Sequence, residues 1–290
     1  MLAIPSKKRR GSLMPLITMT REMGSLGKDV AAQLSERLGK QVVHHEIIGH
    51  LANKMRLRKS HVIRLLDGKA GIWERLTADK TSLAIYTADE VFRLAENDQV
   101  AVIRGWGAAH LLRPISHVVC VRVCAPQELR VRRMMERLNT DDRDFVESEI
   151  KLSEEAHGAI TRRHFGINWQ DPENYDLVLN TKRLTIDECA EEIMNLHDDP
   201  AFRETPDSMR VFGNLALQTH VQAALRRDPR TSNMMISIEA DESRVTLSGV
   251  LEAGLEAKDA VEVATGVTGV KDVTNRLRTA SEHSPFHIAG

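Results

Sequence analysis

The feature that most constrains the fold is the stretch Leu16–Val30, where a short apolar strand, a glycine-containing turn and a helix follow one another. Glycines tolerate positive φ and let a backbone close around a ligand. A helix N-terminus offers free N–H groups and a positive dipole end to an anion such as phosphate. Lys28 would add a mobile charge at that point. The stretch therefore predicts a phosphate site, of the kind that holds a nucleotide triphosphate.

This stretch matches the phosphate-binding pattern G-x-x-x-x-G-K-[ST] in part. Gly27 and Lys28 are in place, whereas Glu22 occupies the first glycine position and Asp29 the serine or threonine position. From these residues alone, a plain strand-to-helix connection remains an alternative to a phosphate site.

Apolar runs alternate with helical patterns up to Leu196, which favours a parallel sheet covered by helices on both faces. Three of these runs predict strands buried on both faces: Val100–Ile103, His117–Cys124 and Tyr175–Asn180. Ligands of such sheets bind beyond the carboxyl ends of the strands. The turn after Thr20 and a second glycine turn, Arg104–Ala108, both lie at such ends. Their shared position strengthens the prediction of a phosphate site.

Several helices are expected between and after these strands. The apolar spacing predicts helices over 30–38, 46–58, much of 60–99 and 141–164. A helix after Pro126 carries four arginines, Arg130, Arg132, Arg133 and Arg137, which an exposed basic face would also explain. A closing helix, Thr185–Leu196, has a candidate N-cap at Thr185.

A second, smaller α+β module is expected after a polar, proline-punctuated linker at residues 198–208. A helix over Val211–Arg227 precedes two antiparallel strands, Met234–Ala240 and Arg244–Ser248, which are followed by a helix over Leu255–Thr265 and a strand over Val270–Leu277. The expected divisions are a basic disordered tail (1–14), the first domain (15–197), the linker (198–208), the second domain (209–279) and a disordered tail (280–290).

The composition is that of an ordinary soluble globular protein, with 42% apolar and 28% charged residues in 290. A formal net charge of −1 gives no overall field for nucleic acid, and no apolar run is long enough to span a bilayer. The basic cluster Lys7–Arg10 precedes no apolar signal-peptide region, so we expect a cytoplasmic protein. Neither the three cysteines nor His44, His45 and His50 are spaced to complete a metal site, so no protein metal ligand is predicted.

The residues up to about 197 resemble the cytidylate kinase-like family, a branch of the P-loop nucleoside monophosphate kinases. The resemblance rests on five segments in order: Ile17–Lys28, Val102–Ala108, Ala125–Arg133, Phe165–Trp169 and Asp171–Thr181. It implies a P-loop kinase-like parallel sheet and phosphoryl transfer from ATP, with Mg²⁺, to CMP, dCMP or a similar monophosphate.

The resemblance also implies roles for individual residues. The donor phosphates would lie at the loop residues Gly24, Ser25, Leu26, Gly27, Lys28 and Asp29. Lys28, Arg130 and Arg133 would neutralise charge during the transfer, which needs positioning and positive charge more than a covalent catalyst. The monophosphate would contact Arg104, Arg162 and Arg163.

The chain departs from the family pattern at four positions. Leu26 replaces one of two adjacent glycines, Trp106 and His157 replace arginines, and His44 replaces an acidic residue. Each loss would remove charge-assisted hydrogen bonds of roughly 1.5–3 kcal/mol or crowd the phosphate. These departures keep a second hypothesis open, a catalytically degenerate kinase fold that senses nucleotide. A scaffold that binds no nucleotide is a third.

The second module resembles a BON domain. The matching segments are Leu225–Pro229, Val245–Val250 and Val267–Asn275, the last with the order G-V-x-x-V-x-N. The resemblance implies a binding module that localises or regulates the chain through a phospholipid surface or a protein partner. Gly249 and Gly269 are expected to form turns, and no ligand is assigned to them.

Overall fold

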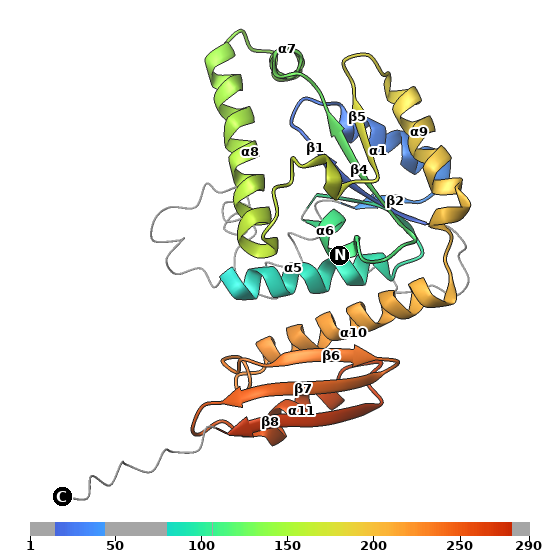
Figure 1. Cartoon of the computed structure of the whole chain (residues 1–290). Helices are drawn as coiled ribbons and strands as arrows, with labels where there is room; N and C mark the ends of the chain where they lie inside the picture. The colour runs from blue at the N-terminus through green and yellow to red at the C-terminus, as the bar shows by residue number, and fades with distance from the viewer. Residues whose placement is uncertain (1–14, 44–79, 106, 280–290) are drawn as a thin grey trace, which may run out of the picture. The chain divides into compact units, whose positions relative to one another are not determined.

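The structure is a computed structural model that describes residues 15–43, 80–105 and 107–279 (Figure 1). The chain divides into two compact units, Met1–Met209 and Arg210–Gly290, each described by itself. The sequence predictions for both tails, for residues 46–79, for the three histidines at positions 44–50 and for Trp106 lie outside the described residues.

The first unit is built on a five-stranded parallel sheet in the order β2-β3-β1-β4-β5 (Figure 1). The strands are β1 (Leu16–Arg21), β2 (Gln41–Val43), β3 (Val100–Arg104), β4 (Val118–Cys124) and β5 (Leu177–Asn180). Central β1 pairs in parallel with both β3 and β4, so that Ile17 faces Val102 on one side and Val119 on the other. The predicted P-loop kinase-like parallel sheet is confirmed.

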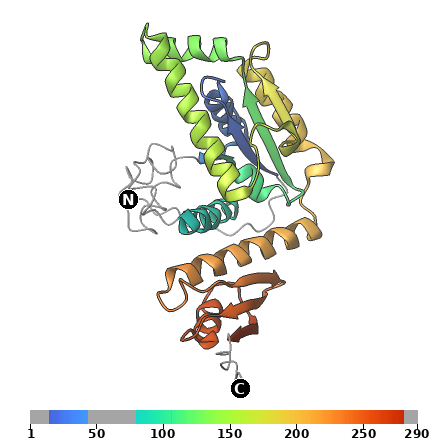
Figure 2. The ribbon, with the colours of Figure 1, turned by 60° about the vertical axis from the view of Figure 1, so that its left-hand side comes forward.

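Helices cover both faces of this sheet (Figures 1 and 2). Apolar residues of α1 (Gly27–Leu38) and α9 (Ile186–Asp198) form one core with Ile17 and Met19 of β1. On the other face lies α6 (Ala108–Leu112). The Ala109 carbonyl of this helix accepts a hydrogen bond from Cys120 Sγ. Side chains alternate between the two faces along β4, so Cys120 faces away from the core that Val119 and Val121 share with α1 and α9. The remaining helices are α5 (Lys80–Ala95), α7 (Gln127–Leu138), α8 (Arg143–Phe165) and the short η1 (Pro172–Asn174) and η2 (Pro200–Phe202).

Local sequence explains where several helices begin. The Thr185 side chain accepts a hydrogen bond from the Glu188 N–H, and the Glu188 carboxylate accepts one from the Thr185 N–H, which is a capping box. The predicted cap at Thr185 is thus confirmed. Asp142 caps α8 by accepting from the Phe145 N–H at 2.9 Å.

Three sequence predictions about elements were wrong. Gly249, expected to form a turn, lies within the strand Arg244–Leu251 and pairs with Leu277 of the neighbouring strand. The strand at β5 is not buried on both faces, because it lies at the edge of the sheet and Val178 is 38% exposed, while Leu179 is buried. The helix expected from Val211 begins inside the expected linker, at Pro206. Proline suits the first turn of a helix because its fixed φ is already helical and its missing N–H would have no partner there.

The second unit has a three-stranded sheet in the order β6-β7-β8, with β6 (Ser237–Asp241) antiparallel and β8 (Asp272–Thr279) parallel to β7 (Arg244–Leu251). Apolar residues of α10 (Pro206–Arg227) and α11 (Ala257–Thr265) pack with Val245 and Leu247 in one core. The predicted small α+β domain with its antiparallel strand pair is confirmed. Within the described ranges, none of the helices is both long and apolar enough to cross a membrane.

Candidate functional site

The loop between β1 and α1 is a tight turn at the carboxyl edge of the sheet. Gly24 has φ +80° and Leu26 has φ +63°, and α1 begins at Gly27. The Ser25 N–H donates to the Glu22 carbonyl at 3.2 Å, and the Asp29 N–H donates to the Leu26 carbonyl at 2.9 Å. These bonds hold the turn in a fixed shape.

The same loop leaves polar groups without partners. Within the described part of the chain, the N–H groups of Gly24, Leu26, Gly27 and Lys28 make no hydrogen bond. The hydroxyl oxygen of Ser25, a residue with no exposed surface, also has no partner there. Free N–H groups at a helix N-terminus are suited to an anion, and buried polar groups are rarely left unpaired without a reason. The loop has the donors of a phosphate site.

Two glycines of the loop are required by close packing. A Cβ on Gly24 would lie 2.7 Å from the Arg130 carbonyl oxygen, and one on Gly27 would lie 2.8 Å from Arg21 Cβ. Leu26, in contrast, holds a left-handed backbone that glycine adopts freely and that costs another residue about 1–2 kcal/mol. The loop therefore keeps a glycine-like shape at Leu26 in spite of its side chain.

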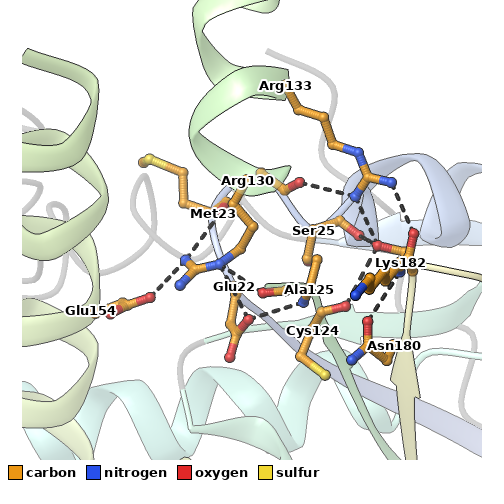
Figure 3. A network of polar contacts seen from close by, with 12 residues as sticks. Glu22, Met23, Ser25, Cys124, Ala125, Arg130, Arg133, Glu154, Asn180 and Lys182 are labelled. Carbon is orange, nitrogen blue, oxygen red and sulfur yellow. Dashed lines mark hydrogen bonds and ion pairs between the residues drawn. The ribbon is translucent and has the colours of Figure 1, made fainter. Parts of the chain in front are cut away.

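On one side of the loop, a buried carboxylate joins three groups of the chain. Glu22, 8% exposed, accepts from Arg122 at 2.6 Å. It also accepts from the Ala125 N–H at 3.1 Å and pairs with Arg130 at 3.4 Å (Figure 3). Arg130 also contacts Glu154 of α8 at 2.6 Å. Its Nε donates to the Ala125 carbonyl at 3.0 Å. This arginine, predicted to neutralise charge during transfer, is bound to the chain's own carboxylates.

The next arginine of α7 contacts the loop and the end of β5. Arg133 donates to the Thr181 hydroxyl and carbonyl, each at 2.9 Å, and to the Gly24 carbonyl at 3.4 Å (Figure 3). The Thr181 hydroxyl in turn donates to the Ser25 carbonyl at 2.9 Å. Burial lowers the pKa of the Arg133 guanidinium, with a smaller contribution from Arg132. Within the described residues, Arg133 has no carboxylate partner.

The residues predicted for the monophosphate lie on different elements. Arg104, 6% exposed, ends β3 beside the loop strand β1, while Arg162 is an exposed residue of α8 whose Nε donates to the Gly158 carbonyl at 3.2 Å. The side chain of Arg163 lies outside what the structure describes. Arg104 and Arg162 therefore come from two different elements, β3 and α8.

His157, where the family pattern has an arginine, lies against an aromatic side chain. Its ring stacks on Trp169 with centroids 4.5 Å apart, and the Arg122 Cζ lies 5.3 Å from the Trp169 ring. Burial lowers the pKa of His157 to about 4, with further contributions from His110, Arg21 and Arg122. Burial likewise lowers the pKa of His110 to about 4. Both histidine rings are therefore uncharged near pH 7.

The sequence analysis assigned no role in the site to three residues at this edge, Arg21, Glu22 and Arg137. Arg137 lies four residues after Arg133, so helical spacing alone places it on the same face of α7. Glu22 replaces the first glycine of the loop pattern, which could have marked it as a residue with another task. Arg21 matches no position of the loop pattern, so nothing in the sequence assigned it a role.

The loop residues fit a nucleotide better than they fit a protein-held metal. Across the described ranges, no group of three His, Cys, Asp or Glu side chains could hold a metal ion. Asp29, exposed in the first turn of α1, is the carboxylate nearest along the chain to the free N–H groups. Mg²⁺ is commonly held by one or two carboxylates together with substrate phosphates and water. Asp29 is thus the residue suited to a magnesium ion bound with a nucleotide.

A parallel sheet of this order, with a glycine turn and a helix N-terminus at its carboxyl edge, defines a kinase-fold protein. The chain belongs to the cytidylate kinase-like family, whose family model matches residues 16–183. Residues 214–281 match the model of the BON domain. Both resemblances inferred from the sequence are thereby confirmed.

Individual proteins support the same two assignments. A cytidylate kinase of Methanothermobacter thermautotrophicus is 27% identical over 168 residues, which cover 58% of this chain and 96% of that protein. A cytidylate kinase of Sulfurisphaera tokodaii is 28% identical over 160 residues, 53% of this chain and 87% of that protein. The osmotically-inducible protein Y of Escherichia coli is 36% identical over 107 residues, 35% of this chain and about half (53%) of that protein.

Proposed function

We propose that the chain binds ATP with Mg²⁺ at the loop Gly24–Asp29 and transfers the terminal phosphoryl group to a nucleoside monophosphate such as CMP or dCMP. The observation that supports the proposal most is the set of unbonded N–H groups at Gly24, Leu26, Gly27 and Lys28 beside the unpartnered hydroxyl of Ser25. The two cytidylate kinases of similar sequence support the same reaction class.

In this proposal the chain's own residues position the phosphates and compensate their charge. The loop N–H groups and Lys28 hold the donor phosphates, and Asp29 holds the magnesium ion that the phosphates bring. Arg133 approaches from α7, and Arg104 and the arginines of α8 meet the monophosphate. Arg130 orients the loop through Glu22 and remains a candidate to neutralise charge only if it leaves Glu154. Positioning of this kind is the main requirement of phosphoryl transfer.

A second candidate function is a nucleotide sensor without turnover. The left-handed Leu26 places a Cβ where the backbone has to approach a phosphate, and His157 supplies an uncharged ring where the family has a cation. Both changes weaken the stabilisation of a transition state more than the binding of a ground state, because charge on the transferred group is spread during the reaction.

The experiment that separates these functions is a thermal-shift titration with Mg·ATP and a panel of CMP, dCMP, UMP and AMP, followed by a coupled assay of ATP consumption. Stabilisation by Mg·ATP with turnover of one monophosphate supports the kinase. Stabilisation without turnover supports the sensor. Folded protein that no nucleotide stabilises overturns both.

The controls are two lysine variants. We expect Lys28→Ala to lose the Mg·ATP shift and to reduce turnover at least about 100-fold. Lys271→Ala, a change at an exposed lysine of the second unit, should leave both unchanged. If Lys28→Ala still binds Mg·ATP as the wild type does, the nucleotide binds at a site other than this loop.

The second unit is proposed to localise or regulate the first through a phospholipid surface or a protein partner. Its exposed apolar residues support this role, since Met235 is 87% and Val250 is 63% exposed. Because the proposed reaction consumes ATP, we assign the chain to the cytoplasm. Co-sedimentation of the full chain with vesicles of anionic phospholipid tests the binding to lipid, and Met235→Ser should weaken it. If the variant binds the vesicles as the wild type does, Met235 is not part of the lipid-binding surface.

A further inference from the structure

The last residue of β1, Arg21, occupies a position where a cation is electrostatically unfavourable. Alternation along β1 places Arg21 on the face of Ile17 and Met19, which pack against α1. Its Cβ and Cδ lie 2.8 and 3.4 Å from the point where a Cβ of Gly27 would be. Gly27 is the first residue of α1, whose N-terminus carries the positive end of the helix dipole. The start of α1 is therefore an unfavourable surrounding for the positive charge that this side chain carries.

The surroundings add to this unfavourable field. Within the described residues, the side chain of Arg21 makes no hydrogen bond and no ion pair, although it is half-buried. Burial lowers the pKa of Arg21, and the positive charge of Arg137 lowers it further, while Asp29 acts in the opposite direction. Arg137 also has no carboxylate partner in the described chain.

A half-buried, unpaired guanidinium beside a helix N-terminus and a second arginine needs a negative charge to become favourable. The loop provides independent signs of a missing anion, because the hydroxyl of fully buried Ser25 and four backbone N–H groups have no partner in the described chain. A side chain that serves only packing would explain the contact between Arg21 and Gly27. It would not explain why the hydroxyl of Ser25 and the four N–H groups of the neighbouring loop have no partner in the described chain.

We propose that Arg21, together with Arg137, binds the phosphate chain of the nucleotide held at the loop. This inference rests on the proposed function and extends it, since neither residue belongs to the set expected from the sequence. The ligand chemistry is a polyphosphate with at least two adjacent phosphate groups, because the loop N–H groups hold one phosphate and the arginines reach the next. Two guanidinium groups suit such a chain, as each can bind phosphate oxygens bidentately.

The test uses the full chain, its Arg21→Gln and Arg21→Lys variants, and Arg132→Gln as a matched control. Arg132 is an exposed arginine of α7 next to Arg133. The probes are inorganic tripolyphosphate and Mg·ATP, with affinity from calorimetry and stability from thermal unfolding without ligand. We expect Arg21→Gln to weaken both probes at least about tenfold. Arg21→Lys should be intermediate, and Arg132→Gln should bind as the wild type does.

The stability of the unliganded protein separates a ligand-binding role from a structural one. If Arg21 serves an anion, Arg21→Gln relieves repulsion and leaves the melting temperature unchanged or raised. If it serves packing, the melting temperature falls and the affinities stay the same, which overturns the inference. A double variant Arg21→Gln with Arg137→Gln should lose less affinity than the sum of the single changes; strict additivity would overturn the pairing of the two arginines.

Failure of the inference and failure of the proposed function give different results. Wild-type protein that binds tripolyphosphate and Mg·ATP, with Arg21→Gln binding them equally well, overturns the role of Arg21 alone. Wild-type protein that binds neither probe overturns both proposals.

Discussion

The two sides of the loop after β1 differ in how their charges are compensated. On the carboxylate side, Glu22 and Glu154 pair with Arg122 and Arg130. On the open side, Arg21, Lys28, Arg133 and Arg137 have no carboxylate partner within the described residues. The difference teaches which arginines are part of the fold and which are available to a ligand, although Arg130 of the first group and Arg133 and Arg137 of the second lie on the same helix, α7.

The largest expected effect is the loss of the carboxylate itself. Glu22→Gln keeps the shape of the side chain but removes the charge that pairs with Arg122 and Arg130, so we expect the free energy of unfolding to fall by about 3 kcal/mol. Urea unfolding measures this. The control is Glu147→Gln, in an exposed pair with Arg143, which should change stability by less than about 0.5 kcal/mol. If Glu22→Gln changes the free energy of unfolding by less than about 1 kcal/mol, the paired charges on the carboxylate side do not stabilise the fold as we infer.

The next prediction contrasts Arg130 with Arg133. Arg130→Gln leaves Glu22 with one partner fewer and should reduce stability by about 2 kcal/mol, with a smaller effect on ligand affinity. Arg133→Gln should weaken Mg·ATP binding about tenfold, which is about 1.4 kcal/mol, and cost about 1 kcal/mol of stability through Thr181. Urea unfolding and calorimetry on the same preparations check both. A larger loss of stability in Arg133→Gln and a larger loss of affinity in Arg130→Gln would contradict these assignments.

A smaller effect follows from the burial of His157, to which Arg21 and Arg122 add. Its pKa of about 4 lies below the unfolded value of about 6.5, so the unfolded chain binds more protons between these values. Stability is therefore complete above about pH 6.5 and falls on acidification, by up to about 1.4 kcal/mol per pH unit for this histidine. Urea unfolding at several pH values measures the slope. His157→Phe keeps the stack on Trp169 and should reduce the slope; an unchanged slope would mean that His157 is charged in the native state.

The smallest expected effect concerns Leu26. Leu26→Gly relieves a left-handed backbone worth about 1–2 kcal/mol but adds the conformational entropy of glycine, about 0.5–1 kcal/mol. The net change in stability should stay within about 1 kcal/mol. Removal of the Cβ should improve Mg·ATP affinity a few-fold, as calorimetry would show. Weaker binding would mean that the Leu26 side chain itself contacts the nucleotide.

Much of the fold was predictable because its signals are local. Apolar runs, glycine turns and the cap at Thr185 each depend on a few neighbouring residues, and they gave the parallel sheet, most of the described helices and the smaller domain. The position of β5 at the edge was not predictable, because strand order depends on long-range pairing.

The candidate site was predictable in its loop and not in its partners. The glycines and Lys28 follow from one stretch of chain. The bonds of Glu22 to Arg122 and Arg130 depend on the register of β1 with β4, where Thr20 faces Arg122, and on where α7 begins. The hydrophobic periodicity predicts neither the register of the two strands nor the residue at which α7 begins. The sequence could therefore identify a basic helix without showing that Arg130 is buried and Arg133 only partly so.

The stack of Trp169 against His157 has a practical consequence. Trp169 follows α8 in the chain. Its indole contacts His157, which belongs to α8, and Arg122, which belongs to the sheet, so the surroundings of the indole depend on both elements. The chain has two other tryptophans, Trp73 and Trp106. Replacing both by phenylalanine would leave a single fluorophore, and its emission wavelength and lifetime would then report any displacement of this helix from the sheet while nucleotides are mixed with the protein.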